Sequence, residues 1–165
     1  TRSGGRTEPL GAATRELIAY VPQGNTVFSG TILENLVMVA PEASEEEAEE
    51  ALKTACAWDF VKELPDGIHS VVGEKGNGLS EGQAQRISIA RAVLKKAPVI
   101  LFDEATSALD EETGRQVLCN IRRKMEYCTC IIVTHRSSLL EACTSVFRLE
   151  NGKLIRAAEG QNDEE

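Results

Sequence analysis

Three short apolar runs along the chain have the pattern of buried β-strands. They are LIAYV at 17–21, VILF at 99–102 and CTCIIVTH at 128–135. A continuous apolar run of this length is typical of a strand in a parallel sheet, which is covered by helices on its faces. Pro22 directly follows the first run and ends it. The pattern therefore predicts at least three strands of a mostly parallel sheet.

The segments between these runs have helical or turn patterns. Ser44 is followed three residues later by Glu47, which predicts a capping box at the start of an acidic helix. Asn151-Gly152 predicts the turn of a β-hairpin. Further helices are predicted at 30–38, 59–64, 111–125 and 137–143.

The alternation of strands and helices indicates an α/β fold. We divide the chain into an α/β core, a helix-rich block and an acidic tail. The core is expected to comprise residues 1–29 and 97–160, and the helical block residues 30–96. Residues 161–165 are expected to be disordered, because they are polar and mostly acidic.

Composition and charge argue against some classes of protein function. The chain has 165 residues, a length suited to one domain, and a formal net charge of -8, which argues against binding to nucleic acid. No apolar run is long enough to cross a bilayer, and no signal peptide is visible. The first residue is Thr1, so we expect an excised piece of a longer protein.

The cysteines do not form a metal-binding pattern. The spacing of Cys56, Cys119, Cys128, Cys130 and Cys143 is not of the zinc type. Cys128 and Cys130 flank one residue of a predicted strand and therefore share a face. We expect all five to be buried free thiols in a reducing compartment.

Candidate chemistry begins at the end of the strand 99–102. Asp103 and Glu104 follow that strand, at the edge where ligands bind in open α/β sheets. One carboxylate could hold Mg²⁺ and the other could activate a water molecule. A solvent-exposed strand end without function could have the same local sequence, so this pair alone does not establish a catalytic site.

A second candidate is the helix start LSEGQ at 79–83. Ser80 and Gln83 have the spacing of a capping box. A helix N-terminus also attracts phosphate through its free N–H groups, and Gly82 would let a phosphate approach the backbone closely. The segment suits either role.

The combined block resembles a known family. Residues 79–110, LSEGQAQRISIARAVLKKAPVILFDEATSALD, resemble the signature-to-Walker-B block of the ATP-binding cassette (ABC) ATPases. Further segments are similar to ABC exporters in the same order. They are YVPQ at 20–23 (Q-loop), NTVFSGTILENL at 25–36, DGIHSVVGEKGNG at 66–78 (X-loop), SALD at 107–110 (D-loop) and IIVTHR at 131–136 (H-loop).

The resemblance implies a first group of residues that act on the nucleotide of the same chain, with ATP and Mg²⁺ as cofactors. Asp103 and Gln23 would hold or sense Mg²⁺, and Gln23 would also link the site to a membrane domain. Glu104 would be the general base that polarises the attacking water. His135 would contact the γ-phosphate.

The resemblance implies a second group that acts across an interface. Ser80, Gly82 and Gln83 would contact ATP held by a second ABC ATPase domain in a head-to-tail dimer, and Asp110 would connect the two sites. Glu74, in the X-loop, would couple the domain to a transmembrane domain in the same chain. These partners imply a position at the cytoplasmic face of the cell membrane, and no nucleic acid is expected.

The sequence departs from the family pattern in two places. Glu81 stands where the commoner signature has glycine, and we expect its side chain to point toward solvent. More importantly, the pattern G-x-x-x-x-G-K-[ST], which cradles nucleotide phosphates, is not found in the chain. We therefore expect an N-terminally truncated, P-loop NTPase-like ABC domain that is inactive alone. The strand that precedes the absent loop is expected beside residues 99–102, so its loss would expose an apolar edge and face.

Two alternative functions remain at this stage. One is a non-transport ABC ATPase, for which the exporter-like segments at 25–36 and 66–78 are unusual. The other is a degenerate cassette that serves as an interaction module. The presence of Gln23, Glu104 and His135 argues against such decay.

Overall fold

A parallel sheet forms the framework of the structure, a computed structural model that describes residues 2–3, 6–7, 11–24, 26–73 and 78–159. Its strands are β3 (Ile18–Val21), β6 (Val99–Asp103) and β7 (Thr129–Val133), in the order β3-β6-β7. Both pairings are parallel, as the apolar runs predicted. The predicted α/β class is confirmed.

The position predicted for an additional strand is wrong. We expected it beside residues 99–102, but β6 is the central strand of the described sheet. It pairs with β3 along one edge and with β7 along the other. Because both edges of β6 are already hydrogen-bonded, a further strand could join this sheet only at β3 or β7.

The remaining elements include the helices that cover the sheet. In chain order they are β1 (Arg2–Ser3), β2 (Arg6–Thr7), η1 (Ala12–Leu17), β4 (Gly30–Thr31), α1 (Ile32–Val37), α2 (Glu45–Thr54), α3 (Trp58–Val61), η2 (Gly67–His69), β5 (Val71–Val72), α4 (Glu81–Leu94), α5 (Glu111–Lys124), η3 (Ser137–Ala142), β8 (Ser145–Glu150) and β9 (Lys153–Glu159). The short segment η3 is a 3₁₀ helix. The hairpin β8–β9 turns at Asn151-Gly152, as predicted.

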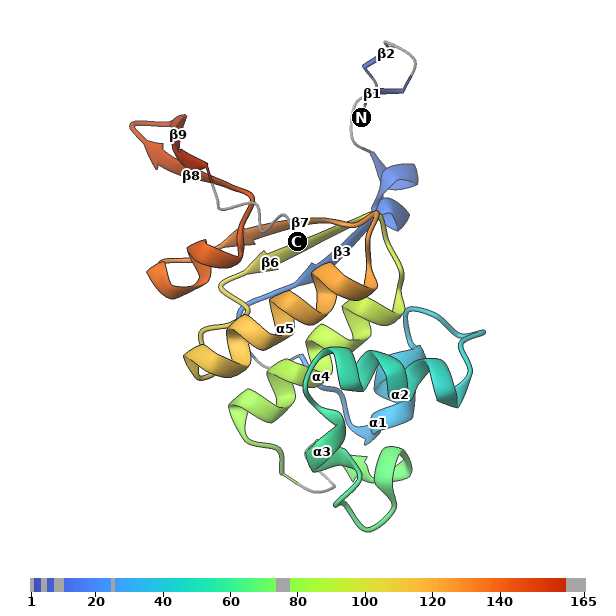
Figure 1. Cartoon of the computed structure of the whole chain (residues 1–165). Coiled ribbons are helices and arrows are strands. Elements are labelled where there is room, and N and C mark those ends of the chain that lie inside the picture. Colours follow the sequence, from blue (N-terminus) through green and yellow to red (C-terminus); the bar gives the residue numbers. More distant parts are fainter. Residues whose placement is uncertain (1, 4–5, 8–10, 25, 74–77, 160–165) are drawn as a thin grey trace.

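Local capping determines where the main helices begin. The Ser44 hydroxyl accepts a hydrogen bond from the Glu47 amide at the start of α2, which confirms the predicted capping box. The helices α1 to α3 lie together below the sheet, with α4 and α5 between them and the strands (Figure 1). The helix α4 contacts both the sheet and the helical block, since it packs against β3 as well as α1 and α2.

One face of the sheet is covered and the other is not. The helices α4 and α5 lie against one face (Figure 1), and Ala19, Val21, Ile100 and Phe102 are buried in the core. The alternate residues of each strand point to the other face. Leu101 pairs with Tyr20 on one side and with Ile131 on the other, so these three side chains share that face. On this face Tyr20, Ile131 and Val133 are about half exposed. The expected exposure of an apolar sheet face is confirmed.

The cysteines are all free. Cys119 is exposed on α5, so the expectation that every thiol is buried is wrong for this residue. Burial raises the pKa of the Cys130 thiol to about 12, and the neighbouring Cys128 adds to the effect. The two side chains lie close to each other, as the spacing predicted, although Cys128 directly precedes β7 and is not part of the strand.

Candidate active site

Three candidate residues meet where the parallel strands end. Gln23 follows β3, Glu104 follows β6 and His135 follows β7. The Gln23 side-chain amide donates to Glu104 Oε2 at 3.1 Å, and His135 Nδ1 lies 3.6 Å from Glu104 Oε1. The structure thus brings together residues that are far apart in the sequence, with Glu104 in the middle.

The backbone turns sharply at Glu104. Its φ angle is 50°, in the left-handed region that residues other than glycine rarely adopt. Its amide donates to the carbonyl of Val133 at 2.9 Å, and its carbonyl accepts from the Ser107 amide at 3.0 Å. These bonds hold the strained turn, which places the carboxylate of Glu104 between Gln23 and His135 rather than in line with the strand. Strain of this kind is common at functional sites.

Asp103 occupies a different place from its neighbour. It lies on the open face of the sheet, where Tyr20 Oη donates to its Oδ2 at 2.9 Å. This hydrogen bond raises the pKa of Tyr20, because the phenolate form would lose the bond and be repelled by the carboxylate. Sequence reasoning missed Tyr20, although the period of two along β3 and β6 could have paired it with Asp103 on one face.

The oxygen atoms at this edge are suited to Mg²⁺, which prefers carboxylates, water and phosphate oxygens. Asp103 provides one carboxylate on the open face, and Glu104 provides another at the edge where the strands end. Within the described ranges, no cluster of three or more His, Cys, Asp or Glu side chains forms a complete metal site. Such a set fits a magnesium ion that takes most of its ligands from a nucleotide and water.

The helix start at Ser80 has the capped geometry predicted from sequence. The Ser80 hydroxyl accepts from the Gln83 amide at 3.2 Å, and the Gln83 side-chain oxygen accepts from the Ser80 amide at 2.9 Å. A Cβ atom at Gly82 would lie 2.9 Å from the carbonyl oxygen of Ala108. Glycine is therefore required for close packing against the loop 106–110, a reason that sequence reasoning missed. Glu81 is exposed, as expected.

The loop 106–110 is held at its end and along its backbone. Asp110 caps α5 by accepting from the amide and the hydroxyl of Thr113, at 2.8 and 2.7 Å. These bonds lower the pKa of Asp110. Arg136 donates through Nη1 to the carbonyls of Thr106 and Leu109, at 2.6 and 2.7 Å. Nothing in the local sequence pointed to Arg136, which directly follows His135.

The two predicted groups of residues are separate in this chain. Among the residues that the structure describes, no hydrogen bond or ion pair joins Ser80, Gln83 or Asp110 to the cluster around Glu104. Glu74, the residue assigned to coupling, lies outside the described residues.

Comparison with known proteins identifies the family of this fold and site. A family model described as "ABC transporter" matches residues 7–107. This match covers more than half of the chain, which therefore belongs to the ABC transporter family. The ATP-binding domain of an exporter is the part of the family that it matches.

Proteins similar to this chain in sequence include a flippase and an export protein. The chain is 43% identical over 160 residues to the ATP-dependent lipid A-core flippase of Francisella novicida, covering 92% of this chain and 27% of the flippase. It is 44% identical over 138 residues to a putative export ATP-binding/permease protein of Rickettsia bellii (strain RML369-C), covering 84% of this chain and 24% of that protein.

A solved structure has the same fold. The chain superposes on a bacterial Atm1-family ABC exporter with ATP bound, with a TM-score of 0.78 and 38% identity, covering 88% of this chain and 25% of that one. The chain thus spans about a quarter of the length of these relatives. In the part of the chain that is described, no helix has the length and apolar character needed to cross a membrane.

Proposed function

We propose that this chain is part of the ATP-hydrolysing domain of an ABC exporter that works at the cytoplasmic face of a membrane. The observation that carries the proposal is the convergence of Gln23, Glu104 and His135 at the ends of three parallel strands. Ligands of open α/β sheets bind at this edge. The exporter relatives support a transport function over that of a non-transport ABC ATPase or a degenerate cassette.

Each residue of the cluster has a distinct proposed role. Asp103 holds Mg²⁺ together with Gln23, and Glu104 takes the proton of the attacking water as general base. His135, beside Glu104, would contact the γ-phosphate. Magnesium, when bound with ATP, neutralises charge that develops on the phosphate oxygens. The hydrogen bond from Gln23 to Glu104 keeps the carboxylate directed toward the open edge.

The residues that lie apart from this cluster are proposed to act on a partner's nucleotide. Ser80, Gly82 and Gln83 form the capped start of a 14-residue helix, where partial positive charge favours phosphate. Asp110 is exposed at the start of α5. A head-to-tail dimer with a second ABC ATPase domain would bring both segments to the partner's ATP.

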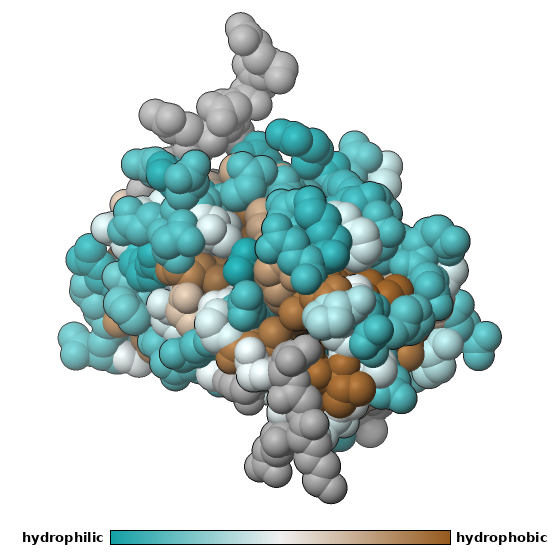
Figure 2. All heavy atoms as spheres, turned by 90° about the horizontal axis from the view of Figure 1, so that it is seen from below, coloured by the Kyte–Doolittle hydropathy of each residue, from teal (hydrophilic) through white to brown (hydrophobic). Residues whose placement is uncertain are grey.

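The helical end of the molecule is proposed to face the transmembrane domain. Figure 2 shows this end from below, with hydrophobic side chains gathered near the middle of the face and hydrophilic ones around them. Met38 and Val71 in the helical block, and Phe28 just before it, are about half exposed. Exposed apolar surface rimmed by polar residues is typical of a protein interface. Glu74, close in sequence to Val71, would contribute to the same contact.

The first test is to read the sequence encoded upstream of Thr1. A G-x-x-x-x-G-K-[ST] loop preceded by several hydrophobic spans is the expected result, whereas a start codon immediately upstream would contradict the exporter proposal. In that longer protein, Glu104→Gln should lower ATP hydrolysis by about 10²-fold or more while ATP binding persists, because only the general base is removed.

Two further substitutions provide controls for this measurement. Glu141→Gln changes an exposed acid on η3 and should leave hydrolysis unchanged. Glu81→Gly should alter hydrolysis only modestly, since an exposed charge at a helix start contributes about 0.3–1 kcal/mol. Full hydrolysis by the Glu104→Gln protein would refute the assignment of the base.

A further inference from the structure

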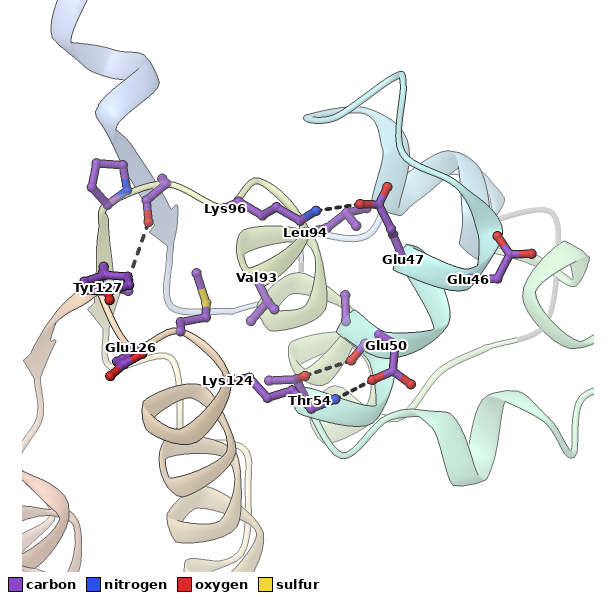
Figure 3. A pocket seen from close by; sticks show the side chains of 15 residues that line it. Glu46, Glu47, Glu50, Thr54, Val93, Leu94, Lys96, Lys124, Glu126 and Tyr127 are labelled. Carbon is purple, nitrogen blue, oxygen red and sulfur yellow. Dashed lines mark hydrogen bonds and ion pairs between the residues drawn. The ribbon is translucent and has the colours of Figure 1, made fainter.

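A cavity of about 700 Å³ lies away from the candidate active site. It opens between α2, the last turn of α4 and the segment that joins α5 to β7 (Figure 3). Its apolar lining is formed by Ala51, Val93, Leu94, Ala97, Met125 and Cys128. A cavity of this size with an apolar floor is typical of small-molecule sites.

The cavity lies at the far ends of three elements that carry candidate site residues. Helix α4 begins at the Ser80 cap and ends at the cavity with Leu94. Strand β6 begins beside Pro98, which lines the cavity, and ends at Asp103. Helix α5 runs from the Asp110 cap to Lys124. The cavity is therefore separated from the active-site edge by the length of these elements.

The margin of the cavity is charged and has an excess of acid. Its charged residues are Glu46, Glu47, Glu50, Glu126, Lys96 and Lys124. Both lysines are already paired, Lys96 with Glu47 at 2.5 Å and Lys124 with Glu50. These pairs connect α2 to the α4–β6 turn and to α5, and Figure 3 shows both at the margin.

Two carboxylates at the margin are not neutralised. Among the described residues, neither Glu46 nor Glu126 has a lysine, arginine or histidine partner within salt-bridge distance. Figure 3 places them on opposite sides of the cavity. The ring of Tyr127, which is 90% exposed, lies beside Glu126. An aromatic face and a nearby carboxylate are both favourable to an ammonium group.

We propose that this cavity binds small amphipathic cations, with an apolar body on the floor formed by Val93, Leu94 and Met125 and a protonated amine at the acidic margin. An anion of the same shape would meet the excess negative charge, and both lysines that could attract it are occupied by Glu47 and Glu50. A neutral molecule would keep the apolar contacts but lose the attraction to Glu46 and Glu126. Charge complementarity therefore selects the cation.

The proposal is tested with three probes of the same carbon skeleton. Phenylbutylamine, phenylbutanol and phenylbutyrate are titrated into the full 165-residue chain carrying labelled methyl groups, and the NMR shifts are followed. Saturable shifts at Val93, Leu94 and Met125 are expected, with the affinity order amine, alcohol, carboxylate. Shifts confined to other methyl groups, or equal affinity for the three probes, would overturn the proposal.

A matched pair of double variants tests the role of charge. Glu46→Gln with Glu126→Gln should weaken amine binding about three- to tenfold and leave the alcohol unchanged, because exposed charge pairs contribute modestly. Glu63→Gln with Glu141→Gln makes the same change in net charge at exposed positions that do not line the cavity. Equal weakening by both pairs, or by neither, would show that the amine does not depend on this margin.

Discussion

At the scale of single residues, the arrangement around Glu104 shows how a strained backbone positions a charged group. Because φ of Glu104 is positive, the carboxylates of two consecutive residues lie in different surroundings. Asp103 accepts a hydrogen bond from Tyr20 on the open sheet face, whereas Glu104 contacts Gln23 and His135 at the edge. Two adjacent acids can therefore serve two chemical roles. The amide of Glu104 stabilises the turn by bonding to the carbonyl of Val133.

Gly82 gives a residue-scale prediction about stability. In Gly82→Ala the new Cβ would meet the Ala108 carbonyl at 2.9 Å, so the backbone of the loop 106–110 must shift. We expect a loss of about 1–2 kcal/mol in the free energy of unfolding, even after the better helix propensity of alanine. Urea denaturation measures it. Gly78→Ala is the control, because nothing lies within 4 Å of its added Cβ.

Increased stability of the Gly82→Ala protein would contradict the close packing of α4 on the loop 106–110. The comparison with Gly78→Ala separates a local clash from a general effect of replacing glycine. Neither substitution alters charge, so electrostatics cannot account for a difference between them.

At the scale of elements, α2 packs Ala48, Ala51 and Leu52 into the core and is also joined to neighbouring elements through charged side chains. Glu50 accepts hydrogen bonds from Lys124 of α5 and from Lys53 of its own helix, and Lys96 reaches Glu47. The ammonium groups lower the pKa of Glu50 from 4.5 to about 2. The folded chain therefore binds this proton more weakly than the unfolded chain does.

This pKa predicts a dependence of stability on pH. The contribution of Glu50 should be complete above about pH 4.5 and should be lost as the pH falls toward 2. Glu50→Gln should therefore lower the melting temperature at pH 7 by about 1–3 °C, and the difference from the parent should vanish near pH 2. Scanning fluorimetry across this range checks it.

The matched control for the Glu50 measurement is Glu63→Gln, at an exposed position with no salt bridge among the described residues. Its melting temperature should follow that of the parent at every pH. A Glu50 effect that persists unchanged below pH 2 would mean that the ion pair is not its source.

At the scale of the whole molecule, the chain carries the acids and the histidine of the proposed nucleotide site, but its sequence contains no G-x-x-x-x-G-K-[ST] loop to cradle phosphates. Backbone N–H groups and the lysine of such a loop supply much of the grip on the β- and γ-phosphates. We therefore expect no saturable binding of Mg-ATP to this chain at micromolar concentrations. Calorimetric titration is the measurement, and clean saturation in that range would refute the expectation.

The uncovered sheet face predicts self-association of the chain. Ile131 and Val133 are each 50% exposed on β7, at an edge of the described sheet. Replacing both with threonine should raise the concentration at which dimers form in sedimentation experiments, because apolar area is removed from the contact. The same change at Leu149 and Leu154, exposed on the hairpin, is the control.

Dispersal of the oligomer by the hairpin variant alone would place the contact on β8–β9 instead of the sheet. A monomer at high concentration with a sharp, high melting transition would contradict the prediction of self-association entirely.

Much of the fold and of the candidate site could be predicted from local sequence. Apolar runs located the strands, and side chains three residues apart located the helix starts at Ser44 and Ser80. Local patterns could not show that β6 pairs on both edges, which is why an additional strand was placed wrongly beside it. Strand neighbours are chosen by packing across the whole sheet, which no short segment records.

The sequence by itself determined the order of elements, the helix caps and the identity of the family, because these depend on residues close together along the chain. Only the tertiary structure decided which distant groups touch: Tyr20 with Asp103, Gln23 with Glu104, and Arg136 with the carbonyls of Thr106 and Leu109. Strand register and the turn at Glu104 bring these groups together. Both result from packing and hydrogen bonding between segments that lie up to 83 residues apart.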